Sequence, residues 1–138
     1  MKRKGASIIF INSRDKILLF LRDDLPHIPF PNMWDIPGGH VEPGESPDVC
    51  IVREMNEEMG MTLTGFHYFR MFDFPDREEY IFWKKADLDI DAIDLTEGQC
   101  LKWFTHEEIR HTALPFGFNE VVERFFEHYP LSDDEALR

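Results

Sequence analysis

The sequence predicts a single domain of the α/β class, in which helices pack on a β-sheet. The chain has 138 residues, which is the length of one typical domain. Hydrophobic residues make up 43% of it and include thirteen phenylalanines, enough to fill a core. Short strand-like runs alternate along the chain with segments of helical periodicity, and this alternation indicates a sheet covered by helices.

The first part of the chain predicts a β-hairpin followed by a long loop. Residues 6–12 and 16–22 are rich in isoleucine and leucine and flank a polar Ser-Arg-Asp turn, a pattern typical of two paired strands. Residues 23–39 contain four prolines and end in two glycines. This composition predicts an ordered loop without a regular element.

A helix is predicted over residues 47–59. Ser46 and Pro47 have the form of an N-cap followed by proline at the first helical position, and Gly60 stands where a C-terminal cap belongs. At about 100° per residue, the apolar side chains fall on one side of this helix and three glutamates fall on the other. The apolar set is Val49, Ile51, Val52, Met55 and Met59, and the acidic set is Glu54, Glu57 and Glu58.

The three glutamates concentrate negative charge on one helix face. Two carboxylates roughly 5 Å apart repel each other by about 3 kcal/mol at an effective dielectric constant of about 20. The groups can relieve this repulsion by spreading into solvent, as on any acidic surface, or by sharing a cation. Mg²⁺ binds a few carboxylates together with substrate phosphates. The helix by itself leaves both interpretations open.

The remaining elements complete the sheet and its cover. Thr105 and Glu108 have the spacing of a capping box, which predicts the start of a short helix. An apolar stripe predicts a longer helix over 118–129, packed against the sheet. Further strands are expected over 66–74, 79–87 and 99–104.

Composition and charge exclude several classes of function. The net charge is −12 and the pI about 4.8, so a broad basic face for a nucleic acid polymer or an anionic membrane is not expected. Cys50 and Cys100 are too few for a disulfide framework, and the first apolar run is too short for a signal sequence or membrane span. We therefore expect a cytoplasmic protein, with residues 1–130 forming the domain and 131–138 a C-terminal tail.

The spacing of charged residues and glycines around the helix fits one known motif. The order is Gly39, five residues, Glu45, seven residues, Arg53-Glu54-Met55, one residue, Glu57-Glu58, one residue and Gly60-Met61. For typical residue frequencies, chance agreement at these positions is on the order of one in a hundred million. The chain resembles the Nudix hydrolase family over nearly its whole length. The resemblance implies an α/β/α sandwich with a mixed β-sheet, and hydrolysis of a nucleoside diphosphate linked to another group.

The resemblance also implies roles for individual residues. Mg²⁺, for which Mn²⁺ can substitute, would neutralise the phosphates and activate water. Glu45 and Arg53 resemble the family's structural ion pair, and Gly39 and His40 lie where the substrate phosphates would bind. The implied metal ligands are the Gly38 carbonyl, Glu54, Glu57, Glu58 and Glu97, of which Glu54, Glu57 and Glu97 are also the candidate catalytic residues.

A narrower resemblance points to the MutT-like subgroup, which hydrolyses nucleoside triphosphates. It rests on Phe-Pro-Asp-Arg at 74–77, on Thr-Glu-Gly-Gln before Trp103, and on the asparagine that follows Phe118. The residues it places near the nucleotide are Arg22, Arg77 and Asn119. Asn119 could read a purine edge or simply begin a helix, since asparagine suits both. The proline-rich loop and Ile36 depart from the subgroup pattern.

These resemblances predict one function and leave two alternatives. The leading prediction is a pyrophosphohydrolase acting on a nucleoside triphosphate such as an oxidised purine nucleotide. Cleavage of ADP-ribose or of a nucleotide sugar is the second, because the same motif serves those substrates. A non-catalytic, nucleotide-binding regulator is the third, although such domains often lack a motif glutamate that this chain keeps. The expected partner is a small nucleotide, and the chain is expected to be a monomer or a homodimer.

Overall fold

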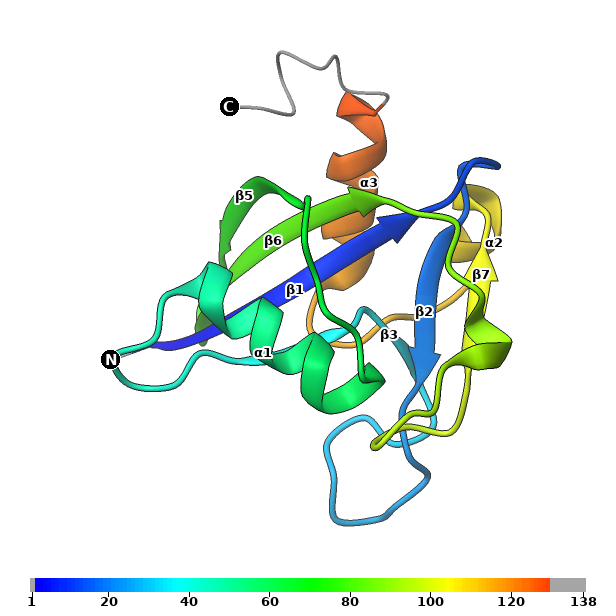
Figure 1. Cartoon of the computed structure of the whole chain (residues 1–138). Helices are drawn as coiled ribbons and strands as arrows, with labels where there is room; N and C mark the ends of the chain where they lie inside the picture. Colours follow the sequence, from blue (N-terminus) through cyan, green and yellow to red (C-terminus); the bar gives the residue numbers. More distant parts are fainter. Residues whose placement is uncertain (1, 130–138) are drawn as a thin grey trace.

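A mixed seven-stranded sheet forms the centre of the molecule (Figure 1). The computed structural model describes residues 2–129, so the expected tail over 131–138 lies outside the described residues. The strand order is β3-β2-β1-β6-β5, with β4 also paired to β1 and β7 to β2. The strands are β1 (Arg3–Ile11), β2 (Ile17–Leu21), β3 (Trp34–Asp35), β4 (Gly38–His40), β5 (His67–Asp73), β6 (Arg77–Lys85) and β7 (Leu101–Phe104).

Strand β1 is the central strand, and its sequence explains why. It pairs in parallel with β6 along its full length and antiparallel with β2 and β4. Ile9 and Ile11 belong to one hydrophobic cluster, whereas Ile8 and Phe10 belong to another on the opposite face. A strand covered on both faces has a continuous apolar sequence, as Ile8–Ile11 does.

Helices cover both faces of the sheet, as the sequence predicted. Helix α1 (Pro47–Met59) lies on one face, and α3 (Phe118–His128) lies on the other (Figure 1). The short α2 (His106–Arg110) begins at the predicted capping box and packs beside α3, and a 3₁₀ turn, η1, spans Ile90–Ala92. None of the helices among residues 2–129 is both long and apolar enough to span a bilayer.

Helix α1 begins and ends where the sequence predicted. Ser46 has an extended backbone (φ −85°, ψ 156°), and Pro47 occupies the first turn. Gly60 adopts the left-handed conformation at φ 63° and donates its amide hydrogen to the Asn56 carbonyl at 3.0 Å. A side chain at Gly60 would strain this cap.

The expectation that 23–39 contains no regular element is wrong. Strand β3 pairs with β2, and β4 pairs with β1 through Ala6↔Gly39 and Ser7↔Gly38. Three of the four prolines precede β3 and the fourth stands between the two strands, so none interrupts a ladder. A Cβ at Gly38 would lie 2.2 Å from the Ala6 carbonyl oxygen, so β4 can approach β1 only with glycine there.

The predicted division of α1 into an apolar and an acidic face is also wrong in part. Val49 is 54% exposed, whereas Cys50 is fully buried together with Ile51. Viewed along the helix axis, Glu54 and Glu58 point in directions between those of Cys50 and Ile51. These two carboxylates therefore share the side of α1 that faces the sheet. Both are half-buried, and only Glu57 is exposed.

Candidate active site

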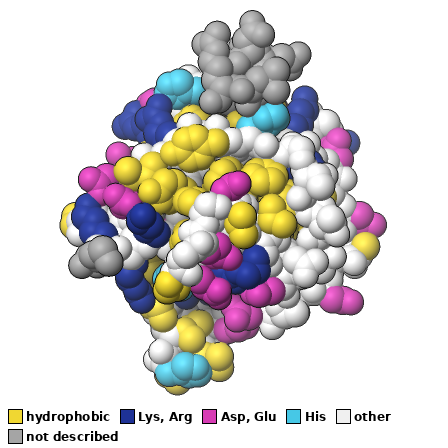
Figure 2. Space-filling model, turned by 60° about the vertical axis from the view of Figure 1, so that its left-hand side comes forward, with side chains coloured by type: hydrophobic (Ala, Val, Ile, Leu, Met, Phe, Trp, Pro, Cys, Tyr) yellow, Lys and Arg dark blue, Asp and Glu magenta, His cyan; other side chains and the backbone are white. Residues whose placement is uncertain are grey.

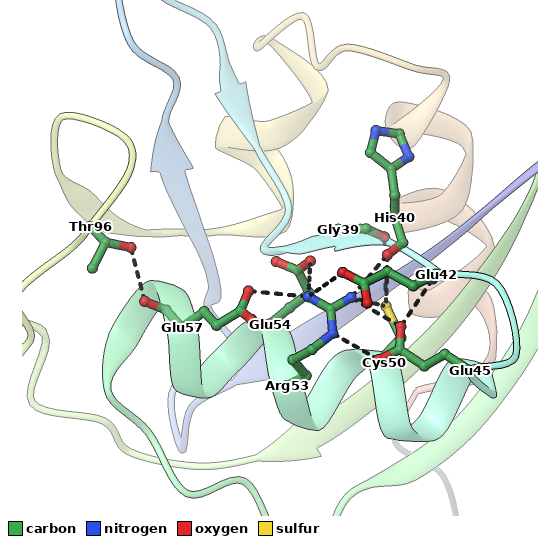
Figure 3. Close-up of polar contacts among 9 residues, drawn as sticks. All are labelled: Gly39, His40, Glu42, Glu45, Cys50, Arg53, Glu54, Glu57 and Thr96. Carbon is green, nitrogen blue, oxygen red and sulfur yellow. Dashed lines mark hydrogen bonds and ion pairs between the residues drawn. The ribbon is translucent and has the colours of Figure 1, made fainter.

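A single guanidinium joins the loop before α1 to the helix (Figure 3). Arg53 donates from Nε to Glu45 Oε2 at 2.7 Å and from Nη2 to Glu45 Oε1 at 3.0 Å. Its Nη2 also donates to the His40 carbonyl at 3.1 Å. Two parallel charge-assisted hydrogen bonds fix the geometry of both partners. The Glu45–Arg53 ion pair therefore attaches the loop that follows β4 to α1.

The same guanidinium also contacts two of the clustered glutamates. Arg53 Nη1 donates to Glu54 Oε1 at 3.0 Å and to Glu57 Oε2 at 3.1 Å. Glu42 approaches the same nitrogen at 3.7 Å from the exposed loop. Arg53 thus offsets part of the charge that accumulates on this face of α1.

Glu58 occupies the part of the site that Arg53 does not neutralise. Burial raises its pKa to about 9, and the charge of Glu54, a hydrogen bond with Glu54, and the charges of Glu97 and Asp35 act in the same direction. Nearby negative charges disfavour the ionised form of a carboxyl group, so the group keeps its proton to a higher pH. The fold therefore brings Glu54, Glu58 and Glu97 together from two different segments of the chain.

Thr96 explains how the loop with Glu97 reaches α1. Its hydroxyl donates to the Glu57 carbonyl at 2.9 Å (Figure 3), and its amide donates to the Glu58 carbonyl at 3.1 Å. On the other side of Glu97, the Gly98 amide donates to Asp23 Oδ2 at 3.3 Å. Both flanks of Glu97 are held, and the loop uses backbone carbonyls at the last turn of α1 that lack helical partners.

Gly39 allows Glu54 to lie against the sheet. A Cβ at Gly39 would come within 2.2 Å of the Glu54 carboxyl carbon. Gly39 thus leaves space for the Glu54 carboxylate. This is a reason for glycine separate from the contact with substrate phosphate that the sequence predicted. Gly44 has φ 80° with no neighbour near its absent side chain, so its requirement for glycine is conformational.

The comparison with protein families agrees with this geometry. The NUDIX domain model matches residues 1–128, which is nearly the whole chain. The chain belongs to the Nudix family. The mixed sheet between two helical layers is the fold that its sequence resemblance implied.

Three similar proteins place this Nudix chain among MutT-like members. The 8-oxo-dGTP diphosphatase of Escherichia coli (strain K12) is 36% identical over 87 residues, covering 60% of this chain and 66% of that protein. A Bacillus subtilis (strain 168) protein provisionally named an 8-oxo-dGTP diphosphatase is 34% identical over 105 residues, covering 75% and 66%. This chain therefore matches slightly less than two thirds of either relative's length.

A solved structure extends the comparison to the fold. It comes from a study of MutT of Aliivibrio salmonicida and Vibrio cholerae, and it superposes with a TM-score of 0.75 at 28% identity. The match covers 94% of this chain and 100% of that chain.

The carboxylates of this Nudix domain fit a hard divalent cation by their chemistry. Glu54, Glu58 and Glu97 can offer carboxylate oxygens as ligands. Burial and the repulsion between these groups disfavour their negative charges, so a bound cation would be favourable. Among residues 2–129, however, no three His, Cys, Asp or Glu side chains already stand at distances suited to one shared ion. Arg53 draws Glu54 and Glu57 toward itself, at 3.0 Å and 3.1 Å from its Nη1.

Arg22 and Arg77 lie together at a second part of the site. The Phe116 ring lies 5.4 Å from the Arg22 guanidinium carbon and 5.2 Å from that of Arg77. Arg22 Nη1 also donates to Asp35 Oδ2 at 2.9 Å, and Arg77 Nε donates to Glu79 Oε1 at 2.8 Å. Two cations on one aromatic ring form a compact surface.

The contacts of Asn119 favour its structural alternative. Its Oδ1 accepts from the Leu114 amide at 2.8 Å, and its Nδ2 donates to the carbonyls of Thr112 at 2.9 Å and Ile109 at 3.4 Å. Both amide hydrogens are thereby used to shape the connection between α2 and α3. A purine edge finds no free donor on Asn119 in this arrangement. His40 is exposed, and its hydrogen bonds run through its carbonyl (Figure 3).

The sequence did not predict a role for three residues near the site, which are Asp35, Glu79 and Thr96. Asp35 is 4% exposed, and burial raises its pKa to about 6 against the opposing effect of Arg22. Glu79 is 7% exposed, and Thr96 holds the Glu97 loop. The burial of Glu79 could have been predicted, because strand alternation places it on the same face as Ile81 and Trp83. The role of Thr96 could not, since its partners are backbone carbonyls, which every residue has.

Replacing Glu45 with glutamine is expected to remove a pH-dependent part of the stability. Hydrogen bonds from Arg53 lower the pKa of Glu45 from 4.5 to about 2. The ionised form is therefore favoured in the folded protein, and its contribution is present above pH 4.5 and lost as the pH falls toward 2. Urea unfolding at a series of pH values should show a stability difference between wild type and Glu45→Gln that shrinks on acidification.

Glu42→Gln is the matched control, because Glu42 stands 3.7 Å from the same guanidinium without a hydrogen bond. It should show a smaller and flatter difference. A Glu45→Gln difference that stays constant down to pH 3 would contradict this account of the ion pair.

Proposed function

We propose that the chain is a Mg²⁺-dependent pyrophosphohydrolase that cleaves a nucleoside diphosphate linked to another group. An oxidised purine nucleoside triphosphate, such as 8-oxo-dGTP, is the preferred substrate. The observation that carries this proposal is the convergence of Glu54, Glu58 and Glu97 at one end of the Arg53–Glu45 framework. The names of the two sequence relatives support the choice of nucleotide.

The carboxylates of α1 and the Glu97 loop are the proposed metal-binding residues. Glu54, Glu57, Glu58, Glu97 and the Gly38 carbonyl would hold Mg²⁺, with Mn²⁺ as a substitute. The bound ion would neutralise the phosphates and lower the pKa of a water molecule that attacks phosphorus in line. Such an ion also explains how a protein of net charge −12 can bind a polyanion.

The chain itself would supply proton transfer and orientation. Glu54, Glu57 and Glu97 are the candidates for the group that takes the proton of the attacking water. Glu97 is the best placed of the three, because both flanks of its loop are held while its side chain has no hydrogen bond to other described residues. Glu54 and Glu57 already share Arg53.

Binding of the nucleotide is assigned to the opposite side of the site. Arg22 and Arg77 would hold the base and sugar through the Phe116 surface, whereas Gly39 and His40 would contact phosphate. On the face in Figure 2, the basic side chains stand in separate groups among acidic ones, which suits a small nucleotide better than a nucleic acid polymer. We further propose a cytoplasmic location, without membrane binding, and a monomer or homodimer.

Hydrolysis is expected to require Mg²⁺ or Mn²⁺ and to depend on Glu58. Glu58→Gln should lower kcat by about 10²-fold or more, since the lost carboxylate organises the site. Because the folded protein raises the pKa of Glu58 to about 9, its ionised form is disfavoured near neutral pH. The variant without metal should therefore be as stable as wild type or more stable, and Mg²⁺ should raise its melting temperature less.

The assay is a nucleotide panel with products identified by mass, and Glu107→Gln on α2 is the control. Glu107 is a helical glutamate as well, but it is 70% exposed and lies 3.7 Å from Arg110, whereas Glu58 is half-buried without an arginine partner among the described residues. Full activity in a chelator, or an unfolded Glu58→Gln protein, would count against the site. ADP-ribose or a nucleotide sugar as the best substrate would keep the hydrolase and replace the MutT-like assignment.

Thr96 is expected to act as a positioning residue for Glu97. Thr96→Val removes the hydroxyl bond to the Glu57 carbonyl and should lower kcat by roughly tenfold while KM stays within about twofold, since the substrate does not touch Thr96. Thr112→Val is a matched control, because Thr112 donates to the Glu108 carbonyl at 2.8 Å at the end of α2. Equal kcat values for the two variants would show that the Thr96 bond serves stability alone.

A further inference from the structure

One carboxylate oxygen of Glu79 is buried without a hydrogen-bond partner. Glu79 lies on β6, and its side chain shares a face of the sheet with Ile81 and Trp83. Arg77 Nε donates to its Oε1 at 2.8 Å, whereas Oε2 has no partner of hydrogen-bonding geometry among the described residues. Burial raises the pKa of Glu79, and Arg77 and the nearby Ser7 hydroxyl act against that rise. An unpaired acceptor inside a protein is costly, so its presence calls for a physical reason.

The neighbouring strand leaves space for this carboxylate. Gly5 of β1 stands opposite Glu79 in the parallel ladder. A Cβ at Gly5 would lie 2.5 Å from Oε1 and 2.7 Å from Oε2, so any other residue would displace the carboxylate. Ser7, on the same face of β1, is buried as well. This face of the sheet is otherwise apolar, and Glu79 and Ser7 are buried polar residues within it.

Glu79 adjoins the cluster of arginines and aromatic rings through Arg77. The guanidinium of Arg77 lies 4.5 Å from the centre of the Phe74 ring and 5.2 Å from that of Phe116, and Arg77 also donates to the Phe116 carbonyl. The exposed Phe30 ring lies 4.8 Å from Phe116. Phe30 and Phe116 both have positive φ, at 51° and 60°. Strained backbone of this kind is concentrated at sites that bind ligands.

We propose that Glu79 is a specificity-determining residue whose Oε2 accepts a hydrogen bond from the base of the nucleotide. The inference rests on the proposed function, and it adds which residue distinguishes the guanine-type edge of that substrate from other bases. Arg77 holds the carboxylate by Oε1 and thereby presents Oε2 as an acceptor. For this contact, the base must enter beside the Phe74 and Phe116 rings that flank Arg77, close enough to meet this oxygen.

The chemistry of purines explains the choice of guanine. A guanine edge presents two neighbouring donors, N1–H and the N2 amino group, and oxidation at C8 leaves both unchanged. An adenine edge presents one amino donor beside N1, which is an acceptor and repels a carboxylate oxygen. Hypoxanthine keeps the N1–H donor and lacks the amino group. Guanine, hypoxanthine and adenine are therefore expected to bind the Glu79 acceptor with decreasing strength, in that order.

Glu79→Gln is the decisive variant. Its carbonyl can still accept from Arg77, but its amino group replaces the free acceptor with a donor. We expect wild type to hydrolyse GTP with a higher kcat/KM than ITP, and ITP with a higher value than ATP. In Glu79→Gln the ratio of GTP to ATP should fall by roughly ten- to a hundredfold, the magnitude of one well-placed base contact. The ATP value itself should hold or rise.

Asp76→Asn is the matched control. Asp76 contacts the same Arg77 guanidinium at 3.2 Å, but its side chain is 69% exposed. This variant removes an equal charge and should keep the GTP to ATP ratio. Glu79→Asp, which keeps the charge and withdraws the carboxylate, should lower the ratio in the same direction and serves if Glu79→Gln folds poorly.

The outcomes separate the inference from the function on which it rests. If wild type hydrolyses neither these three nucleotides nor 8-oxo-dGTP in Mg²⁺, the proposed function fails. If wild type is active but prefers ATP, or if Glu79→Gln changes all three kcat/KM values by one common factor, the function stands and the role of Glu79 is overturned. Binding of GTP and ATP measured by calorimetry in Ca²⁺ should show the same change of ratio, independently of turnover.

Discussion

The site depends on one constraint, which is that Glu54, Glu57, Glu58 and Glu97 gather where α1 meets the sheet. Among residues 2–129, Arg53 offsets the charge of Glu54 and Glu57 but not that of Glu58. Arg53 binds Glu45 in two parallel hydrogen bonds and shares its remaining nitrogen between Glu54 and Glu57. Glu58 is left with a pKa raised to about 9 by burial and by its acidic neighbours. A charge imbalance held in place by the fold is the condition under which a divalent cation binds strongly.

The sheet is adapted to this constraint at specific positions. Gly38 lets β4 approach β1, and Gly39 leaves space for the Glu54 carboxylate. Thr96 brings the Glu97 loop to the last turn of α1. Glu54, Glu57 and Glu58 are therefore held by a regular helix, whereas Glu97 lies in a loop that hydrogen bonds attach to that helix. On the proposed nucleotide side, loops with positive-φ residues meet.

Local sequence patterns predicted the elements better than the contacts between them. Helix α1 was predicted at both ends because Ser46, Pro47 and Gly60 act on their own neighbourhood. Strands β3 and β4 were missed because their pairing comes from β1 and β2, which lie elsewhere in the chain. The partial burial of Glu54 and Glu58 was not predicted, because Val49 was assigned to the apolar face of α1 and Cys50 was not. The two interpretations of Asn119 stayed open because its side-chain amide bonds to backbone groups, which no local sequence pattern marks.

The most direct test of the metal site is anomalous X-ray diffraction from crystals soaked in Mn²⁺. We expect a strong anomalous peak bounded by Glu54, Glu57, Glu58, Glu97 and the Gly38 carbonyl, with Arg53 still bound to Glu45. A peak only at other acidic residues would contradict this expectation. So would the absence of any peak at millimolar Mn²⁺ while Glu54 and Glu57 remain bound to Arg53.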